Sequence, residues 1–249
     1  MAKSERDRDL AVPGTTVPSP GRAEEPLVAD VLATTLEEMG TLAGELEHAP
    51  AGKVVGWAVD RFGPGVSLAC SFQDCVLIDI ATKVDPGIDV VFLDTGAHFP
   101  ETLAYVETVR ARYDLALRVV EPSEEADGWP CGSDRCCELR KVEPLGRALV
   151  GRQAWLTGLK RVDAPTRAQA PVISFDEARG MIKLNPMATW TDEDVACYER
   201  DHHLPTHPLM ALGYRSIGCA PTTRPVAPGE DPRSGRWAGT GKLECGLHL

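Results

Sequence analysis

Residues 65–94 read "GVSLACSFQDCVLIDIATKVDPGIDVVFLD" and hold two short apolar segments with β-branched residues, separated by a stretch of helical character. The segments at 65–72 and 88–94 are typical of buried strands, and residues 75–83 are typical of a helix. The same alternation continues with a helical pattern at 100–113 and a strand pattern at 115–122. Strands that alternate with helices predict the α/β class, with an open parallel sheet and helices on both faces.

The pattern extends in both directions from this stretch. A fourth strand is predicted at 153–159, and residues 181–187 form either a fifth strand or part of an edge hairpin. Apolar residues three and four apart at 27–47 predict an amphipathic helix, and residues 51–63 a second one.

Three regions of different composition divide the chain. Residues 1–25 mix charge with Pro, Gly, Ser and Thr, which predicts a disordered arm. We expect one α/β domain over 26–214. Residues 215–249 are rich in Pro, Gly and Arg with little periodicity, and we expect them to form a mobile C-terminal tail that serves the site.

Composition limits the classes of function. The 249 residues carry a net charge of −11, which argues against binding to nucleic acid or to an anionic membrane. No apolar run is long enough to span a membrane and no secretory signal is visible, so we expect a cytoplasmic protein. Eight cysteines in such a protein favour metal binding or thiol chemistry over a disulfide framework.

Three loops follow predicted parallel strands: "CSFQD" at 70–74, "LDTGAHFPET" at 93–102 and "TGLKRVDAPTRA" at 157–168. Ligands collect at the carboxyl ends of such strands, so we expect the binding site there. The alternative for the first loop is an ordinary turn in which Ser71 or Asp74 only caps the following helix.

The third of these loops is basic within an acidic protein. Lys160, Arg161 and Arg167 lie close to Gly158, and this grouping favours recognition of a phosphate or sulfate. Each cation could instead pair with a surface carboxylate.

The cysteines fall into two groups. Cys136 and Cys137 are adjacent, and a disulfide between them would be strained, so ligation of a metal or cluster shared with Cys219 is indicated. The alternative is two successive thiols on a helix, one buried and one without a role. Three other cysteines lie on apolar strand or helix patterns and are predicted to be buried core thiols: Cys70, Cys75 and Cys197.

The chain resembles the assimilatory adenylyl-sulfate reductases of bacteria from about Leu27 to Leu249. The resemblance rests on seven motifs in order: "CSFQD", "FLDTGAHFPET", "CCELRKVEPL", "TGLKRVDAPTRA", "GCAP", "DPRSGRW" and "ECGLH". It implies an adenine-nucleotide hydrolase-like fold related to pyrophosphate-loop ATPases. It also implies thioredoxin-dependent reduction of adenylyl sulfate to sulfite and AMP, in sulfate assimilation and cysteine biosynthesis.

The resemblance implies roles for particular residues. Cys245 would attack the sulfuryl sulfur and carry it as a Cys-S-sulfonate, on a tail hinged at Gly239, Gly241 and Gly246. His248 would lower the thiol pKa as an imidazolium or contact substrate, the alternative being a solvated terminal histidine. Lys141 would reach both a cluster and the substrate sulfate. Substrate would be bound by Ser71, Phe72, Gln73, Asp94, Thr95, Gly158, Lys160, Arg161, Arg233 and Arg236.

The resemblance further implies a four-iron, four-sulfur (4Fe-4S) cluster on Cys136, Cys137, Cys219 and a cysteine three residues later. Thr222 stands at that last position, and a hydroxyl is a poor iron ligand. Three alternatives follow. The cluster persists on three cysteines, with one iron open to solvent or bound by another donor such as Cys131. Otherwise the cluster is lost, or the threonine is an introduced substitution. We expect a labile, three-cysteine cluster.

Three other functions compete with this one. A cluster-free reductase of 3′-phosphoadenylyl sulfate is the nearest, although the paired cysteines argue against it. An ATP pyrophosphatase of related fold needs two glycines where Phe72 and Gln73 stand. A non-catalytic iron-sulfur or zinc protein predicts no role for Cys245.

Overall fold

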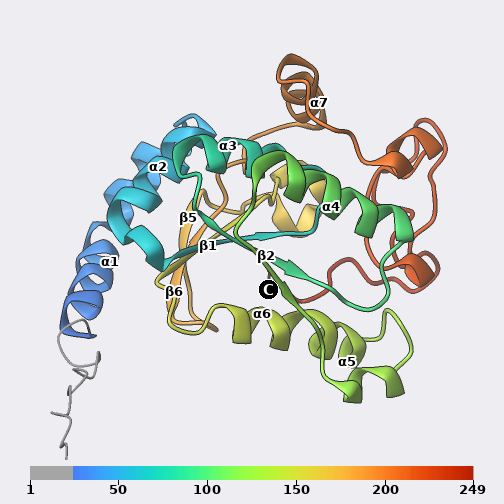
Figure 1. Ribbon diagram of the computed structural model, residues 1–249, viewed down its shortest axis with the longest axis horizontal. Helices are drawn as coiled ribbons and strands as arrows, with labels where there is room; N and C mark the ends of the chain where they lie inside the picture. Colours follow the sequence, from blue (N-terminus) through green and yellow to red (C-terminus); the bar gives the residue numbers. More distant parts are fainter. Residues whose placement is uncertain (1–24, 249) are drawn as a thin grey trace, which may run out of the picture.

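The computed structural model describes residues 25–248 and contains a six-stranded sheet (Figure 1). The strand order is β3-β2-β1-β4-β6-β5, with every neighbouring pair parallel except β5 and β6. The strands are β1 (Val66–Cys70), β2 (Asp89–Leu93), β3 (Leu117–Val120), β4 (Ala154–Thr157), β5 (Ile173–Asp176) and β6 (Met181–Leu184). The predicted open parallel sheet is confirmed for five strands.

One edge of the sheet differs from the prediction. β5 was not predicted, and it pairs antiparallel with β6 as a hairpin whose turn includes Gly180 at φ +66°. The segment at 181–187 is therefore both a strand parallel to β4 and half of an edge hairpin. The sequence pattern of such a short hairpin strand is weak, because only four residues of β5 pair.

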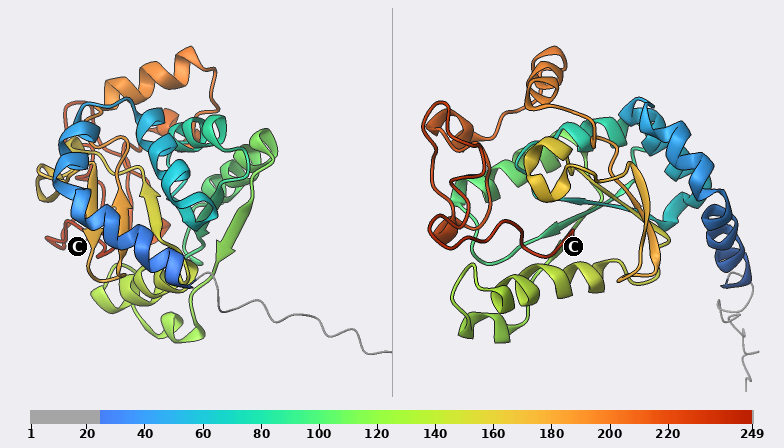
Figure 2. Two further views of the ribbon diagram at one scale, coloured as in Figure 1. Left: turned by 90° about the vertical axis from the view of Figure 1, so that its left-hand side faces the viewer. Right: turned by 180° about the vertical axis from the view of Figure 1, so that it is seen from behind.

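Helices cover both faces of the sheet (Figures 1 and 2). Those on one face include α2 (Ala51–Phe62), α3 (Val76–Val84) and α4 (Pro100–Tyr113), while α5 (Asp134–Cys137) and α6 (Glu143–Ala148) lie on the other. The remaining α-helices are α1 (Glu25–Glu47) and α7 (Asp192–Asp201). The short helices are η1 (Gly63–Gly65), η2 (Glu124–Gly128), the π-helix η3 (Glu138–Val142), η4 (Arg161–Asp163), η5 (Pro165–Arg167), η6 (Pro208–Leu212) and η7 (Ala220–Thr222).

The predicted N-terminal arm lies outside the described residues except for Glu25, with which α1 begins. None of the helices formed by residues 25–248 is long and apolar enough to cross a membrane.

The main core lies between the sheet and the α2, α3 and α4 layer. Leu68 of β1, Leu156 of β4 and Ile182 of β6 point into it and are fully buried. Val54 and Ala58 of α2 pack against them from the helix side, at the four-residue spacing of one helix face. This packing fixes the strands whose carboxyl ends build the site.

A smaller core lies on the opposite face and includes the end of the chain. Leu145 and Leu149 of the α6 region pack with Trp155 and Met181, and Leu247 packs against them. The tail, predicted to be mobile, is therefore docked on the sheet in this structure. Its burial of apolar surface favours the docked position.

The predicted burial of three thiols is confirmed only in part. Cys75 is fully buried and its Sγ lies 3.9 Å from the Pro205 carbonyl. Cys197 is partly exposed on α7, where its thiol donates to Glu193, because no residue of α7 is fully buried. Cys70 is also only partly buried and faces a pocket. The prediction is wrong for these two residues.

His207 should make stability depend on pH. Its Nδ1 accepts from the Leu209 N–H at 3.2 Å, so its proton is on Nε2, 3.0 Å from Thr102 Oγ1. Burial lowers the pKa of His207 to about 4. The folded state favours neutral His207. The contribution of His207 to the free energy of unfolding is therefore complete above the unfolded pKa of about 6.5 and is lost as pH falls toward 4.

We expect up to about 3 kcal/mol of the free energy of unfolding to be lost across this range through His207. Urea unfolding at pH 7 and pH 4.5 measures it, and the loss should be smaller in His207→Gln. A His203→Gln control, which alters an exposed histidine, should lose as much as the parent chain. Equal losses in all three proteins would contradict the prediction.

Candidate active site

A pocket opens where the strand order reverses, between β1 and β4. Parallel sheets bind ligands at such a switch point because the two flanking loops diverge there. Ser71 and Gln73 follow β1, Thr95 follows β2 and Gly158 follows β4, and all four line the pocket. The site predicted from the carboxyl-end loops is therefore assembled as one cavity.

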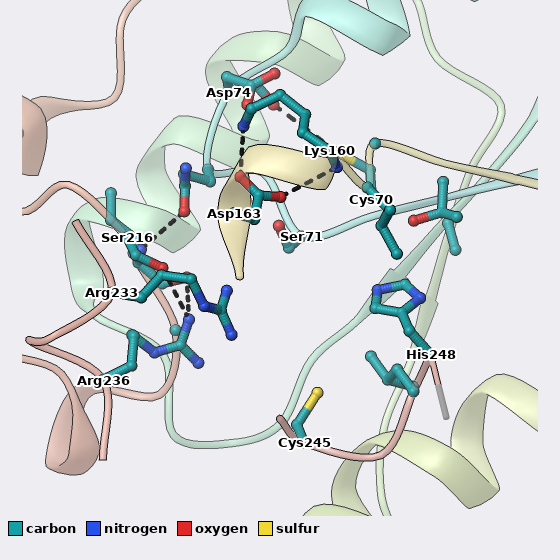
Figure 3. Close-up of a pocket in the computed structure, with 18 of the residues that line it drawn as sticks. Cys70, Ser71, Asp74, Lys160, Asp163, Ser216, Arg233, Arg236, Cys245 and His248 are labelled. Atoms are coloured by element: carbon teal, nitrogen blue, oxygen red, sulfur yellow. Dashed lines mark hydrogen bonds and ion pairs between the residues drawn. The ribbon is translucent and has the colours of Figure 1, made fainter. Parts of the chain in front are cut away.

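The tail and α5–α6 region close the pocket from the other side. Figure 3 shows Arg233, Arg236, Cys245 and His248 around the same space as Ser71 and Lys160. The predicted site residues that line it are Ser71, Gln73, Thr95, Lys141, Gly158, Lys160, Cys219, Arg233, Arg236, Cys245 and His248.

Three predicted substrate residues do not line the pocket. The Phe72 ring is fully buried, 5.3 Å from the Phe92 ring centre, because a φ of +54° turns its side chain into the core. Asp94 Oδ1 accepts from the Gly96 N–H at 2.9 Å and shapes the loop after β2. Arg161 turns away and binds Glu47 of α1 through two hydrogen bonds of 2.6 and 2.9 Å. The geometry does not support their side chains as ligand contacts.

Four cations surround Cys245 in the pocket: Lys141, Arg167, Arg233 and Arg236. Burial and the neighbouring Arg233 lower the pKa of Arg236, and burial and Arg167 lower the pKa of Arg233. Like charges buried together are unfavourable unless an anion neutralises them. The arrangement is suited to a polyanionic ligand beside the Cys245 thiol.

The Arg236 side chain is fixed by contacts of its Nη1 atom, while its Nε donor is left for a ligand. Its Nη1 contacts Ser216 Oγ at 3.4 Å and donates to the Ile217 carbonyl at 3.2 Å. Its Nε is buried and has no hydrogen-bond partner among the described residues. A Cβ at Gly218 would overlap the guanidinium, so glycine is required for this close approach. An unsatisfied buried donor on a cation indicates a missing acceptor.

Trp237 organises the same group of cations. Its indole is 4% exposed, and the Arg236 guanidinium lies 4.5 Å from the ring centre. Lys141, Arg233 and Lys242 lie at 5.9, 6.0 and 5.8 Å. Cation–π attraction offsets part of the repulsion between these side chains. The only sign of this residue in the sequence was its place after Arg236 in "DPRSGRW".

The other side of the pocket carries carboxylates. Lys160 Nζ lies 2.8 Å from Asp163 and 3.4 Å from Asp192. Burial lowers the pKa of Lys160, but the Asp163 carboxylate outweighs that effect and the pKa is raised. Asp74 Oδ1 accepts from the Val76 N–H at 3.1 Å, as expected of a residue that caps α3. The Lys160 charge is therefore neutralised within the protein.

The tail is tied to the pocket by a buried ion pair. Glu244 forms two hydrogen bonds of 2.7 Å with the Arg167 guanidinium and lies 3.6 Å from Arg233. Burial raises the pKa of Glu244 but the Arg167 hydrogen bonds outweigh it, and the pKa is lowered. This pairing fixes the residue next to Cys245. Only the motif "ECGLH" pointed to Glu244 in the sequence.

Glu244→Gln should release the tail. Breaking a buried pair costs about 3 kcal/mol, so the equilibrium constant for docking of the tail should fall by about 100-fold. Faster hydrogen exchange of the amides from Leu243 to Leu247 would show it. Glu230→Gln, which alters an exposed pair with Arg224, should exchange at the parent rate. Unchanged protection in Glu244→Gln would show that the pair does not hold the tail.

His248 is stacked on Trp155, with ring centres 6.0 Å apart and an interplanar angle of 3°. Its Nδ1 is buried without a hydrogen-bond partner among the described residues. Burial and the nearby Lys183 lower the pKa of His248 to about 3. The ring is therefore neutral at pH 7, which disfavours the imidazolium role. Its location in the pocket is compatible with substrate contact, which stays a prediction.

Four thiols gather behind the cation group. Cys136 and Cys137 are buried on α5, and Cys219 is buried at the pocket wall, 3.6 Å from Thr95 Oγ1. Cys131 lies beside Cys219. Within residues 25–248, no group of three or more His, Cys, Asp or Glu side chains is arranged to hold a metal ion.

Comparison with known proteins decides the family. The phosphoadenosine phosphosulfate reductase domain matches residues 64–225. An adenosine 5′-phosphosulfate reductase from Rhodococcus opacus (strain B4) is 46% identical over 225 residues, which cover 83% of this chain and 91% of that protein. The chain belongs to the phosphoadenosine phosphosulfate reductase family. This membership confirms the resemblance drawn from the seven motifs.

Solved structures agree with this membership. A phosphoadenylyl-sulfate reductase from Candida auris, in a phosphate complex, has a TM-score of 0.66 and 33% identity and covers 76% of this chain and 97% of its own. An FMN adenylyltransferase from Candida glabrata has a TM-score of 0.55 at 16% identity, covering 80% of this chain and 74% of its own. The second likeness concerns the fold alone, and it shows that this chain shares an α/β fold with that protein.

Proposed function

We propose that this protein reduces adenylyl sulfate to sulfite and AMP, with Cys245 as the nucleophile. One observation carries the proposal: Cys245 shares a pocket with the buried Lys141 and the partly buried Arg233 and Arg236 at the switch point of the parallel sheet. The negative charge of a phosphosulfate group would neutralise these three cations. The relative from Rhodococcus opacus is named for the same substrate.

The chemistry balances as two thiol exchanges. The Cys245 thiolate attacks the sulfuryl sulfur, an S–S bond forms, and the bond from sulfur to the phosphate oxygen breaks to release AMP. A dithiol then attacks Cys245 Sγ, and sulfite leaves with the electron pair of the S–S bond. The second thiol of that dithiol frees Cys245 and becomes part of a disulfide, so the dithiol supplies both electrons.

Arg233, Arg236 and Lys141 bind the anion and stabilise charge on the departing phosphate. Ser71, Gln73, Thr95 and Gly158, which line the pocket at the strand ends, hold the nucleotide. The stack of Trp155 and neutral His248 keeps water away from the sulfuryl group.

Thioredoxin is the dithiol that we propose. A protein of that size cannot enter the closed pocket, so the tail must release Cys245 after sulfonation. Loss of the phosphosulfate charge with AMP weakens the hold on the tail, since Arg233 contacts both the pocket and the Leu243 carbonyl at 3.0 Å. Gly239, Gly241 and Gly246 all have positive φ values, between +70° and +90°, and lie where the tail turns.

An iron-sulfur cluster on the gathered thiols is part of the proposal. The four thiols need not surround a single metal ion, because the thiolates of a cubane cluster bind different irons. Soft thiolates select iron-sulfur clusters, and Arg140, Lys141 and Lys242 offset their charge. Lys242 Nζ lies 3.3 Å from Cys137 Sγ. When bound, the cluster tunes the electrostatics beside Lys141 and need not store electrons.

Adenylyl sulfate should be preferred over its 3′-phosphorylated form. Lys160 is already paired with Asp163 and Asp192, so it is not available to bind the additional 3′-phosphate. Sulfite formation with thioredoxin under argon tests both substrates, and we expect kcat/KM to be at least about 10-fold higher for adenylyl sulfate. Preference for the 3′-phosphorylated nucleotide would favour the other reductase, and no sulfite from either would refute the proposed function.

A further inference from the structure

Cys131 lies beside the position where this chain lacks a thiol. It occupies a turn in which the Ser133 N–H donates to the Pro130 carbonyl at 3.1 Å. Gly132 follows at φ +91°, and a Cβ there would lie 2.8 Å from Thr222 Cγ2. The turn is therefore packed directly on Thr222, and only glycine permits this approach.

The Cys131 thiol points toward the other cysteines. It lies close to Cys219, Thr222 and Cys136, each of which interacts with the Cys131 side chain. Cys136 and Cys137 lie in α5, the helix that follows this turn. Ser133 Oγ caps α5 by accepting from the Cys136 N–H at 3.2 Å. One short segment thus carries three thiols to the Cys219 loop.

Charge around this group supports joint ligation. Lys242 Nζ donates to the Gly132 carbonyl at 3.0 Å and to Cys137 Sγ at 3.3 Å, so it joins the turn to α5. Arg140 lies near Cys136, and Lys141 lies near Cys137 and Cys219. Several cations around four thiols suit thiolate ligands of a cluster with net negative charge.

The other cysteines are committed elsewhere. Cys75 contacts Pro205 in the core, Cys197 is on α7, and Cys70 lines the pocket beside β1. Cys245 must remain free as the nucleophile of the proposed reaction.

We propose that Cys131 supplies the fourth thiolate of the cluster held by Cys136, Cys137 and Cys219, in place of a ligand at position 222. The proposal rests on the proposed function for the presence of the cluster. It replaces the expectation of a three-cysteine cluster with a complete set of four thiolates. It also explains why a threonine is tolerated at 222, where its side chain packs on the Cys131 turn.

The test compares the full chain, purified anaerobically and reconstituted with iron and sulfide, with Cys131→Ser and with Cys131→Ser/Thr222→Cys. We expect roughly four irons and four sulfides per chain in the parent protein. Cys131→Ser should lose iron on brief exposure to oxidant at least about 10-fold faster and show the paramagnetic signal of a three-iron cluster. The double variant should return to the parent rate, and the Cys197→Ser control should not depart from it.

Cysteine alkylation makes the test independent of variant folding. In the unsubstituted, reconstituted protein, Cys131 should resist iodoacetamide, and it should be labelled once the iron is chelated. Equal labelling in both states, a Cys131→Ser protein with parent iron content and oxidation rate, or a parent chain that binds no iron would each overturn the assignment.

Sulfite formation in the same samples separates this inference from the proposed function. Sulfite formed by a parent protein whose cluster is unaffected by Cys131→Ser would refute only the fourth ligand. Protection of Cys131 by a cluster, without any sulfonation of Cys245, would refute only the proposed reaction.

Discussion

Cys245→Ser should lower sulfite formation by at least about 10⁴-fold, because the serine hydroxyl is not ionised at neutral pH and cannot accept the sulfuryl group. The parent enzyme mixed with substrate and no reductant should gain about 80 Da, the mass of SO₃, on its last tryptic peptide. The variant should show no adduct. Substrate binding should persist, because Arg233 and Arg236 remain in place.

Cys197→Ser is the matched control for this substitution. Its thiol is on α7, outside the pocket, so turnover and the adduct should be those of the parent chain. Sulfite formation by Cys245→Ser at more than about one tenth of the parent rate would show that another group is the nucleophile.

Arg236→Met should lower kcat/KM by about 10³-fold. The guanidinium stacks on Trp237 and keeps a buried Nε donor free, so it is prepared for an anion and for charge that develops on the leaving phosphate. Methionine fills similar space without charge. Because burial already lowers the pKa of Arg236, removal of the charge relieves a desolvation cost, and the free energy of unfolding should not fall by more than about 1 kcal/mol.

Arg224→Met provides the comparison in the same loop region. Arg224 is about half exposed and pairs with Glu230 at 3.5 Å, so its loss should leave kcat/KM within about twofold of the parent. Steady-state kinetics and urea unfolding measure both effects. If Arg236→Met lost activity and stability in parallel, its role would be structural rather than in anion binding.

The strands were predictable because each is a short apolar run bounded by turn residues. β1, β2, β3 and β4 lie within the predicted segments, and their alternation with helices required parallel pairing. The edge strand β5 was not, since four residues with one fully buried side chain give little pattern. α7 was missed for a similar reason: charged residues make up more than half of it and none of its residues is fully buried.

The candidate site shows a similar division. Arg161 and Arg167 stand in one loop and are equivalent by sequence, yet Arg161 binds Glu47 of α1 whereas Arg167 faces the pocket and holds Glu244. Arg161 lies in η4 and Arg167 in η5, and the turns of these two short helices direct the two side chains to different parts of the protein. Phe72 likewise belongs to a binding motif, but its positive φ sends the ring into the core.

The amino-acid order by itself determined the sheet class, the loops that bear the site and the thiols that gather there, because these depend on local periodicity and on motif residues. Tertiary structure alone decided which cations face the pocket, that His248 is neutral against Trp155, and that Cys131 lies beside Thr222. These properties arise from contacts between residues far apart in the chain, such as Arg167 with Glu244 and Trp155 with His248. Burial and neighbouring charge, which no local pattern encodes, set the chemistry of each side chain.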